Sequence, residues 1–166
     1  IWRPGEGIWY VLRSSDQGVT TQGWGLGTDP FYDIPVPGDY DGDGKMDYAV
    51  WRPGEGNWYI KRSSDGGFTV TQWGSGVAPY NDIPVPGDYD GDGKTDVAVW
   101  RPGEGVWYIK RSSDGGQTEI PWGWGVDPYN DIPVPGDYDG DGKTDLAVWR
   151  PGEGNWYIKR SSDGGF

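Results

Sequence analysis

The chain of 166 residues is strongly acidic and poor in aliphatic side chains. Its formal net charge of −12 repels the phosphate backbone of nucleic acids and the surface of an anionic membrane, so we expect no nucleic-acid binding and no membrane insertion. Cysteine and histidine are both absent, which excludes disulfides, Ser/His/Asp and Cys/His catalytic groups and histidine-based zinc sites.

The composition predicts an all-β fold. Only 34% of the residues are hydrophobic, but they include 12 Trp and 11 Tyr, so the core would rely on large aromatic rings. Gly and Pro are scattered along the whole chain, and no window shows a helical repeat of apolar residues. Short apolar runs bounded by Gly, Pro, Asn and Asp recur instead, as is typical of strands and turns.

A repeat organises the chain, because the string WRPGEG recurs every 49 residues, beginning at Trp2, Trp51, Trp100 and Trp149. Periods of about 40 to 50 residues with short strands are typical of β-propeller blades. We therefore expect a β-propeller of four-stranded 49-residue blades, against the alternative of a β-solenoid or an irregular β array. The expected single array, residues 1–166, divides into a partial blade 1–33, blades 34–82 and 83–131, and a partial blade 132–166.

Within one unit the sequence predicts four strands, at residues 83–88, 96–101, 106–111 and 117–122. They are joined by the acidic stretch PGDYDGDGKTD, the turn RPGEG, the turn SSDGG and a longer connector to the next unit. In the second strand, Val97 and Val99 face one way while Ala98 and Trp100 face the other. Both faces are apolar, which predicts that this strand is buried between neighbouring blades.

The number of units indicates how the array would be completed. Propellers typically need about four to eight blades, and this chain carries about 3.4 units whose two ends restate the same sequence. We therefore expect a homo-oligomer that completes the ring, most simply a dimer.

The acidic stretch predicts a calcium site, because it has the form D-x-D-x-D-G-x-x-D three times. Ca²⁺ takes roughly six to eight oxygen ligands, and alternate residues of a tightly turned loop can point their carboxylates inward to supply them. The backbone carbonyl of the Lys at position 7 would also face the ion. The expected ligands are Asp39, Asp41, Asp43, Lys45 and Asp47; Asp88, Asp90, Asp92, Lys94 and Asp96; and Asp137, Asp139, Asp141, Lys143 and Asp145.

Neither an EF-hand nor a magnesium site fits the sequence of these loops as well as a calcium site does. An EF-hand needs a bidentate Glu at position 12, where this chain has Val50, Val99 or Val148 inside a predicted strand. Mg²⁺ prefers octahedral geometry with retained waters over an all-protein cage. The remaining alternative is a solvated acidic turn in which Asp serves turn geometry alone.

The run PGDYDGDGKTDLAVWRPGEGNWYI resembles the FG-GAP/VCBS type of repeat, which is found in bacterial extracellular propellers and is related to the calcium-bearing blades of the integrin α-subunit head. The resemblance covers the whole chain. It implies a β-propeller with one Ca²⁺ in the hairpin loop between the first two strands of a blade, and an extracellular or cell-surface location. The first unit begins after its loop would occur, so three sites are expected.

The expected function is a calcium-stabilised scaffold or binding module without enzymatic activity. Glycosidase chemistry needs a pair of carboxylates, but Glu119 is the only acidic side chain outside the repeated pattern. One alternative is a lectin, with sites on the face formed by RPGEG and WGxG, because Trp and Tyr rings stack on sugars. A protein ligand and a self-assembling or designed structural array are further alternatives. The candidate ligand-binding residues are Arg101, Glu104, Trp122, Trp124 and Tyr129.

Overall fold

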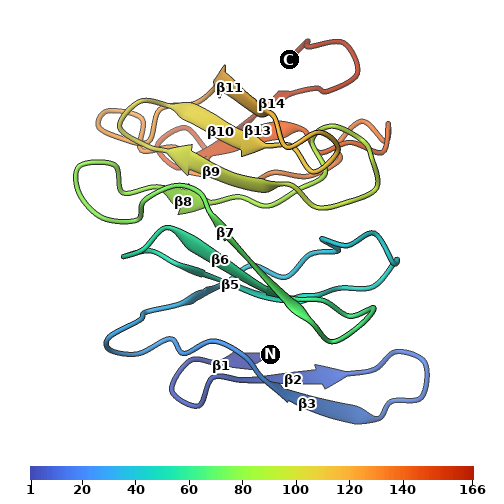
Figure 1. The fold of residues 1–166 in the computed structure, drawn as a ribbon. Helices are drawn as coiled ribbons and strands as arrows, with labels where there is room; N and C mark the ends of the chain where they lie inside the picture. The colour runs from blue at the N-terminus through green and yellow to red at the C-terminus, as the bar shows by residue number, and fades with distance from the viewer.

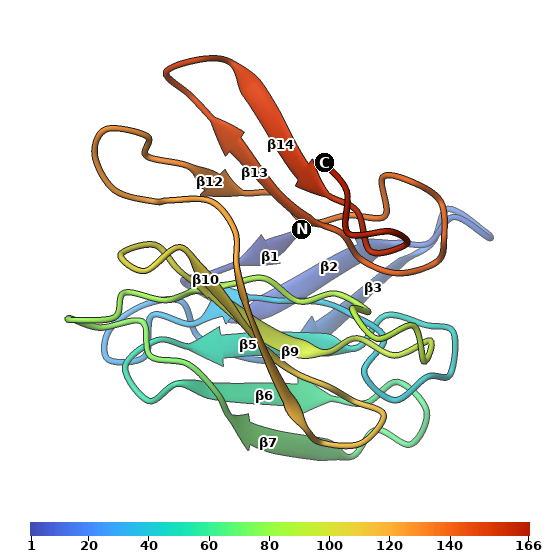
Figure 2. The ribbon, with the colours of Figure 1, turned by 90° about the horizontal axis from the view of Figure 1, so that it is seen from above.

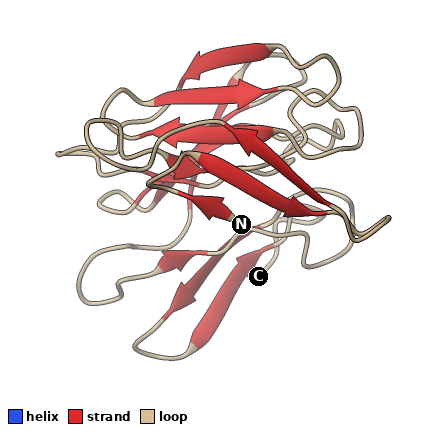
Figure 3. Cartoon of the chain, turned by 90° about the horizontal axis from the view of Figure 1, so that it is seen from below, coloured by secondary structure: helices blue, strands red, loops and turns tan.

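The structure, a computed structural model, describes residues 1–166 and contains strands and turns but no helix (Figure 3). Its strands form four antiparallel sheets that follow one another in chain order (Figure 1). In every sheet, strands adjacent in sequence are hydrogen-bonded neighbours, so each sheet is a simple meander. The all-β prediction is confirmed, and the sheets are consistent with propeller-like blades.

The strand bounds repeat from sheet to sheet. The first sheet contains β1 (Trp2–Arg3), β2 (Ile8–Leu12) and β3 (Val19–Gly23). The second contains β4 (Ile34–Pro35), β5 (Tyr48–Arg52), β6 (Asn57–Lys61) and β7 (Phe68–Gln72). The third contains β8 (Ile83–Pro84), β9 (Val97–Arg101), β10 (Val106–Lys110) and β11 (Gln117–Pro121). The fourth contains β12 (Ile132–Pro133), β13 (Leu146–Arg150) and β14 (Asn155–Lys159).

The first strand of each unit is shorter than the sequence predicts. The expected strand 83–88 is reduced to β8, because Pro84 and Pro86 have no N–H with which to extend the ladder. Beyond β8 the pairing continues through single contacts: the Val85 N–H donates to the Ala98 carbonyl at 2.9 Å, and Gly87 forms an isolated bridge with Asp96. The other three predicted strands of this unit agree with β9, β10 and β11 to within one residue at each end.

The RPGEG turn between the second and third strands depends on its last glycine. Gly105 has φ of +63°, and its N–H donates to the Arg101 carbonyl at 2.8 Å. A side chain at this position would collide with the carbonyl oxygen of Gly123. Only glycine satisfies both demands, so the turn brings β10 back along β9 with Trp107 opposite Trp100.

The hydrophobic core consists of two clusters, and each of them lies between neighbouring sheets. Val97 and Val99 of β9 pack with a cluster from the second unit, while Ala98 and Trp100 pack with a cluster that reaches the fourth unit. Four successive residues of β9, from Val97 to Trp100, are buried. The prediction that the second strand is buried on both faces is therefore confirmed.

Neighbouring sheets are also joined by one recurring hydrogen bond. The indole Nε1–H of Trp73 donates to the Tyr108 carbonyl at 2.9 Å, and Trp24 and Trp122 make the same bond to the sheet that follows them. No hydrogen bond joins residues 1–33 to residues 132–166. Successive sheets are turned relative to one another (Figure 2), and the four form an open arc with the termini at opposite ends of the stack (Figure 1).

Candidate functional site

Each acidic loop joins the first and second strands of its unit, and its first Asp determines its shape. In the third unit, Asp88 accepts the Gly91 N–H at 2.6 Å and the Gly93 N–H at 2.9 Å. Both glycines have positive φ, near +80°, which lets the backbone wrap around this carboxylate. The same bonds recur from Asp39 and Asp137, so the loop geometry is encoded locally in every unit.

Three carboxylates converge in each loop. Their oxygen atoms lie within 4.8 Å of one another in the groups Asp39, Asp41, Asp43; Asp88, Asp90, Asp96; and Asp137, Asp139, Asp145. Each loop thus brings together three of its four predicted carboxylates, leaving out Asp47 in the first, Asp92 in the second and Asp141 in the third. At position 7, the peptide N–H of Lys94 donates to Asp92 at 2.8 Å, and Lys45 and Lys143 repeat this contact.

The last Asp of each loop is buried, with Asp96 and Asp145 fully inaccessible and Asp47 1% exposed. Asp96 accepts the Tyr89 N–H at 2.9 Å and the Ser112 N–H at 2.7 Å. Burial raises the pKa of Asp96, and the two backbone hydrogen bonds only partly oppose that effect. Burial raises the pKa of Asp47 in the same way. None of these three carboxylates has a Lys or Arg partner.

Serine residues of the SSDGG turn complete the loop. In the third unit, the Ser112 hydroxyl donates to Asp92 at 2.9 Å and the Ser113 hydroxyl donates to Asp90 at 2.6 Å. These serines are functional candidates that the Asp spacing alone does not indicate. The signal was nonetheless available, because in a four-stranded meander the connection after the third strand lies at the same end as the connection after the first.

The donor set of these loops fits a hard divalent cation. It consists of convergent carboxylate oxygens, which are the ligands that Ca²⁺ prefers. The only ion pair within the three loops joins the exposed Lys45 ammonium to Asp43 at 3.6 Å. The negative charge is otherwise compensated by peptide N–H groups and hydroxyls alone, so a cation would find oxygen ligands in every loop, and only in the first loop a competing ammonium, that of Lys45.

At the opposite end of the sheets, Arg101 is engaged by the connector that leads into its sheet. Its guanidinium donates to both oxygens of Asp82, at 2.7 and 3.0 Å, and the Asp82 side chain is fully buried. The hydrogen bond to Asp82 raises the pKa of Arg101. The rings of Tyr80 and Tyr108 lie 4.2 and 4.5 Å from the guanidinium carbon, and Glu104 accepts the Tyr108 hydroxyl at 2.6 Å. The sequence signal for Asp82 is the Asp that ends every connector, in PFYD once and in PYND twice.

The three aromatic candidates lie in different surroundings. Trp122 lies between the third and fourth sheets, where its indole donates to the Tyr157 carbonyl at 3.1 Å. Tyr129 contacts the next unit, with its ring 4.1 Å from the guanidinium carbon of Arg150. Trp124 is 39% exposed on the connector. The structure therefore places Arg101 and Glu104 together, and distributes the aromatic candidates over the sheet interface, the next unit and the surface.

Repeated antiparallel meanders, stacked through their faces and each carrying an acidic hairpin loop, define a propeller-like repeat protein. The family model described as FG-GAP-like repeat matches residues 39–99 and 88–148, which together span more than half of the chain. The protein belongs to the FG-GAP-like repeat family. No curated protein matches the chain, and no solved structure matches it. The chain contains no helix that is long and apolar enough to cross a membrane.

Proposed function

We propose that this protein is a calcium-stabilised, non-enzymatic β-propeller-like module for recognition or display outside the cell. The single observation that carries the proposal is the convergence of three carboxylates within 4.8 Å in each of the three acidic loops. FG-GAP-like repeats are typical of extracellular proteins, often bind calcium and typically serve as scaffolds or binding modules, which supports the same function.

The electrostatics of the loops explain why a cation would stabilise the fold. Two like charges about 5 Å apart repel by roughly 3 kcal/mol at an effective dielectric constant of about 20. Burial acts in the same direction, because it raises the pKa of Asp96 and so disfavours its ionised form in the folded loop. That group favours folding at low pH, and this contribution is lost as the pH rises through its folded-state pKa. Calcium would replace the proton in this role at neutral pH.

Each bound ion would add stability by mass action. A ligand that binds only the folded form at about 100 times its Kd stabilises that form by roughly 2.7 kcal/mol. The acidic loop follows the first strand of each blade and contacts the SSDGG turn that follows the third strand. An ion there would therefore fix one end of the blade and support the stacking of its faces.

The proposal is tested by calorimetric calcium titration and by thermal melting with and without EGTA. We expect three sites in the unmodified chain, two in Asp96→Asn, and a melting temperature that falls on chelation. Asp127→Asn is the matched control, because Asp127 lies on the exposed connector where another unit carries Ala78. Absence of calcium binding to the intact chain, or equal loss in Asp127→Asn, would contradict the proposal.

A sugar and a protein are the two candidate classes of ligand for this module, and a structural array without a ligand is the third possibility. The candidate sugar site lies on the face formed by RPGEG and WGxG. There Arg101 already contacts Asp82 and Tyr80, and Glu104 already contacts Tyr108. A glycan array beside a pull-down distinguishes a lectin from a protein-binding module and from a structural array.

A further inference from the structure

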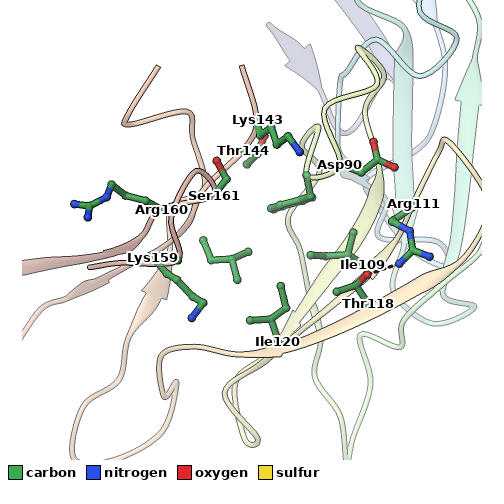
Figure 4. A pocket seen from close by; sticks show the side chains of 13 residues that line it. Asp90, Ile109, Arg111, Thr118, Ile120, Lys143, Thr144, Lys159, Arg160 and Ser161 are labelled. Atoms are coloured by element: carbon green, nitrogen blue, oxygen red, sulfur yellow. Dashed lines mark hydrogen bonds between the residues drawn. The ribbon is translucent and has the colours of Figure 1, made fainter. Parts of the chain in front are cut away.

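A pocket of about 250 Å³ lies between the third and fourth sheets, at the end that carries the acidic loops. Figure 4 shows its lining, which comes from β10 and β11 on one side and from β13, β14 and the neighbouring loops on the other. It is thus at the end opposite to Arg101 and Glu104.

Cationic side chains outnumber anionic ones in the lining of this pocket, although the chain as a whole is acidic. Four of its lining residues are cationic and only Asp90 is anionic. Arg111 and Arg160 are already paired, with Asp114 at 3.0 Å and Asp163 at 2.9 Å, and the guanidinium of Arg160 turns away from the pocket (Figure 4).

Two lysines at the pocket have free ammonium groups. Lys143 and Lys159 make no ion pair with any carboxylate of the chain. The Lys159 ammonium lies 5.5 Å from the centre of the Trp122 ring, which holds it beside the sheet interface. The pocket therefore offers two unneutralised positive charges to a small anion.

The wall of the pocket is apolar where the sheets meet. Ile109, Ile120 and Leu146 line it, and two hydroxyl groups, of Thr118 and Thr144, lie among them. Tyr89 adds its apolar ring to the wall. Its hydroxyl is not free to bind a ligand, because it already donates to the Val85 carbonyl at 2.7 Å. An apolar wall beside a few positive or polar groups is the usual arrangement of a small-molecule site.

We propose that this pocket binds a small carboxylate built on a single six-membered ring. The carboxylate would lie between Lys143 and Lys159, and the ring would lie on Ile120 and Leu146. A pocket of about 250 Å³ lies just below the usual range of roughly 300 to 1,000 Å³ for ligand sites, which limits the ligand to about one ring.

The interface one repeat earlier differs where the ring would lie. Lys94 and Lys110 take the places of the two lysines, but Thr71 and Val97 replace Ile120 and Leu146. The apolar wall is smaller and partly polar there, so we expect one site per chain, between the third and fourth sheets.

Calcium and the carboxylate would reinforce each other. Asp90 lines the pocket and also belongs to the convergent carboxylates of the third unit's acidic loop. A cation in that loop would neutralise the one negative charge at the pocket and strengthen anion binding. This coupling rests on the proposed function, whereas binding of the carboxylate does not.

The test is calorimetric titration of the intact chain with benzoate and, separately, with glucuronate, in calcium and in calcium-free buffer. Benzamide and glucose, which lack the negative charge, are the reference ligands. We expect one site for a carboxylate, affinity that falls with added salt, and about tenfold weaker binding in the double variant Lys143→Gln/Lys159→Gln. Lys61→Gln/Lys110→Gln is the matched control, because these lysines are the equivalents of Lys159 in the two preceding units, and it should bind as the unmodified chain does.

Each outcome decides a separate point. Binding of benzoate alone identifies an aromatic acid, and binding of glucuronate alone identifies a sugar acid; both support the site. Failure of both ligands at millimolar concentration, equal binding of the uncharged ligands, or equal loss in the control variant overturns it. Equal carboxylate binding with and without calcium overturns only the coupling; the calcium site is tested separately by the calcium titration of the proposed function.

Discussion

Asp82 is a fully buried carboxylate whose charge is compensated by a single side chain. Arg101 donates to both of its oxygens, and the Ser75 N–H donates to the same group at 2.9 Å. Asp33 and Asp131 are held in the same way by Arg52 and Arg150. Burial raises the pKa of Asp131, but the hydrogen bonds from Arg150 and the Trp124 N–H outweigh that effect and leave it lowered. These pairs join each connector to the next sheet.

Removing the arginine should therefore cost far more than a surface ion pair does. We expect Arg101→Met to lower the free energy of unfolding by about 3 to 5 kcal/mol, because it leaves the Asp82 charge buried and unpaired. The control Arg111→Met breaks the partly exposed pair with Asp114 and should cost about 1 kcal/mol or less. Urea denaturation measures both.

A second change separates the unpaired charge from lost packing. Adding Asp82→Asn to Arg101→Met removes the buried charge and should restore part of the lost stability. If the double variant is no more stable than Arg101→Met, packing of Arg101 against Tyr80 and Tyr108 accounts for the loss, and the ion-pair argument is wrong.

At the scale of the element, the interface between sheets depends on large aromatic rings. Trp107 of β10 is fully buried, lies opposite Trp100, and donates from Nε1 to the Trp122 carbonyl at 3.0 Å. We expect Trp107→Ala to cost about 3 to 5 kcal/mol, since it leaves a cavity between the third and fourth sheets. Trp124→Ala, on the partly exposed connector, should cost about 1 kcal/mol or less.

Chemical denaturation followed by circular dichroism compares these two variants. Similar losses in both would mean that the interface is not the main source of stability. A loss confined to Trp107→Ala would instead show that the blade is stabilised through its faces, as the clusters around β9 and β10 indicate.

The strands show what the sequence could and could not predict. The burial of β9 on both faces followed from its unbroken apolar pattern. The same pattern recurs in β5 and β13, the equivalent strands of the other units. The reduction of the first strand to β8 was missed, although Pro84 and Pro86 stand within it. Apolar residues suggested a strand, but the missing N–H groups decided its length.

The candidate site was predictable to the same limited degree. The spacing of Asp residues placed the acidic loops, because alternate carboxylates in a tight turn must converge. The contacts of Ser112 and Asp82 were not predicted, since each depends on a partner 16 to 20 residues away, across the meander. The pocket beside Lys143 depends on how two sheets pack, which no local pattern encodes.

At the scale of the whole molecule, equivalent residues have different environments in different units. Trp107 is fully buried by the sheet that follows it, whereas Trp156, at the same position of the repeat, is 55% exposed. Tyr138 of the fourth unit is likewise 45% exposed. Its equivalent Tyr89 in the third unit is partly buried against the core, and this burial raises the pKa of Tyr89 well above the usual range. The face of β13 and β14 is therefore an apolar surface of the kind that other units cover.

This exposed face leads us to expect that the 166-residue chain self-associates at micromolar concentration, most simply as a dimer. Light scattering should then give twice the chain mass of 18.3 kDa, and Trp156→Ala should lower the mass toward that of one chain without loss of the strand signal in circular dichroism. Trp124→Ala, which changes an exposed Trp on a connector, should leave the mass unchanged. A monomeric unmodified chain would contradict the prediction, and a dimer that persists in Trp156→Ala would place the contact elsewhere, because burial of the Trp156 ring is the physical reason to expect association through this face.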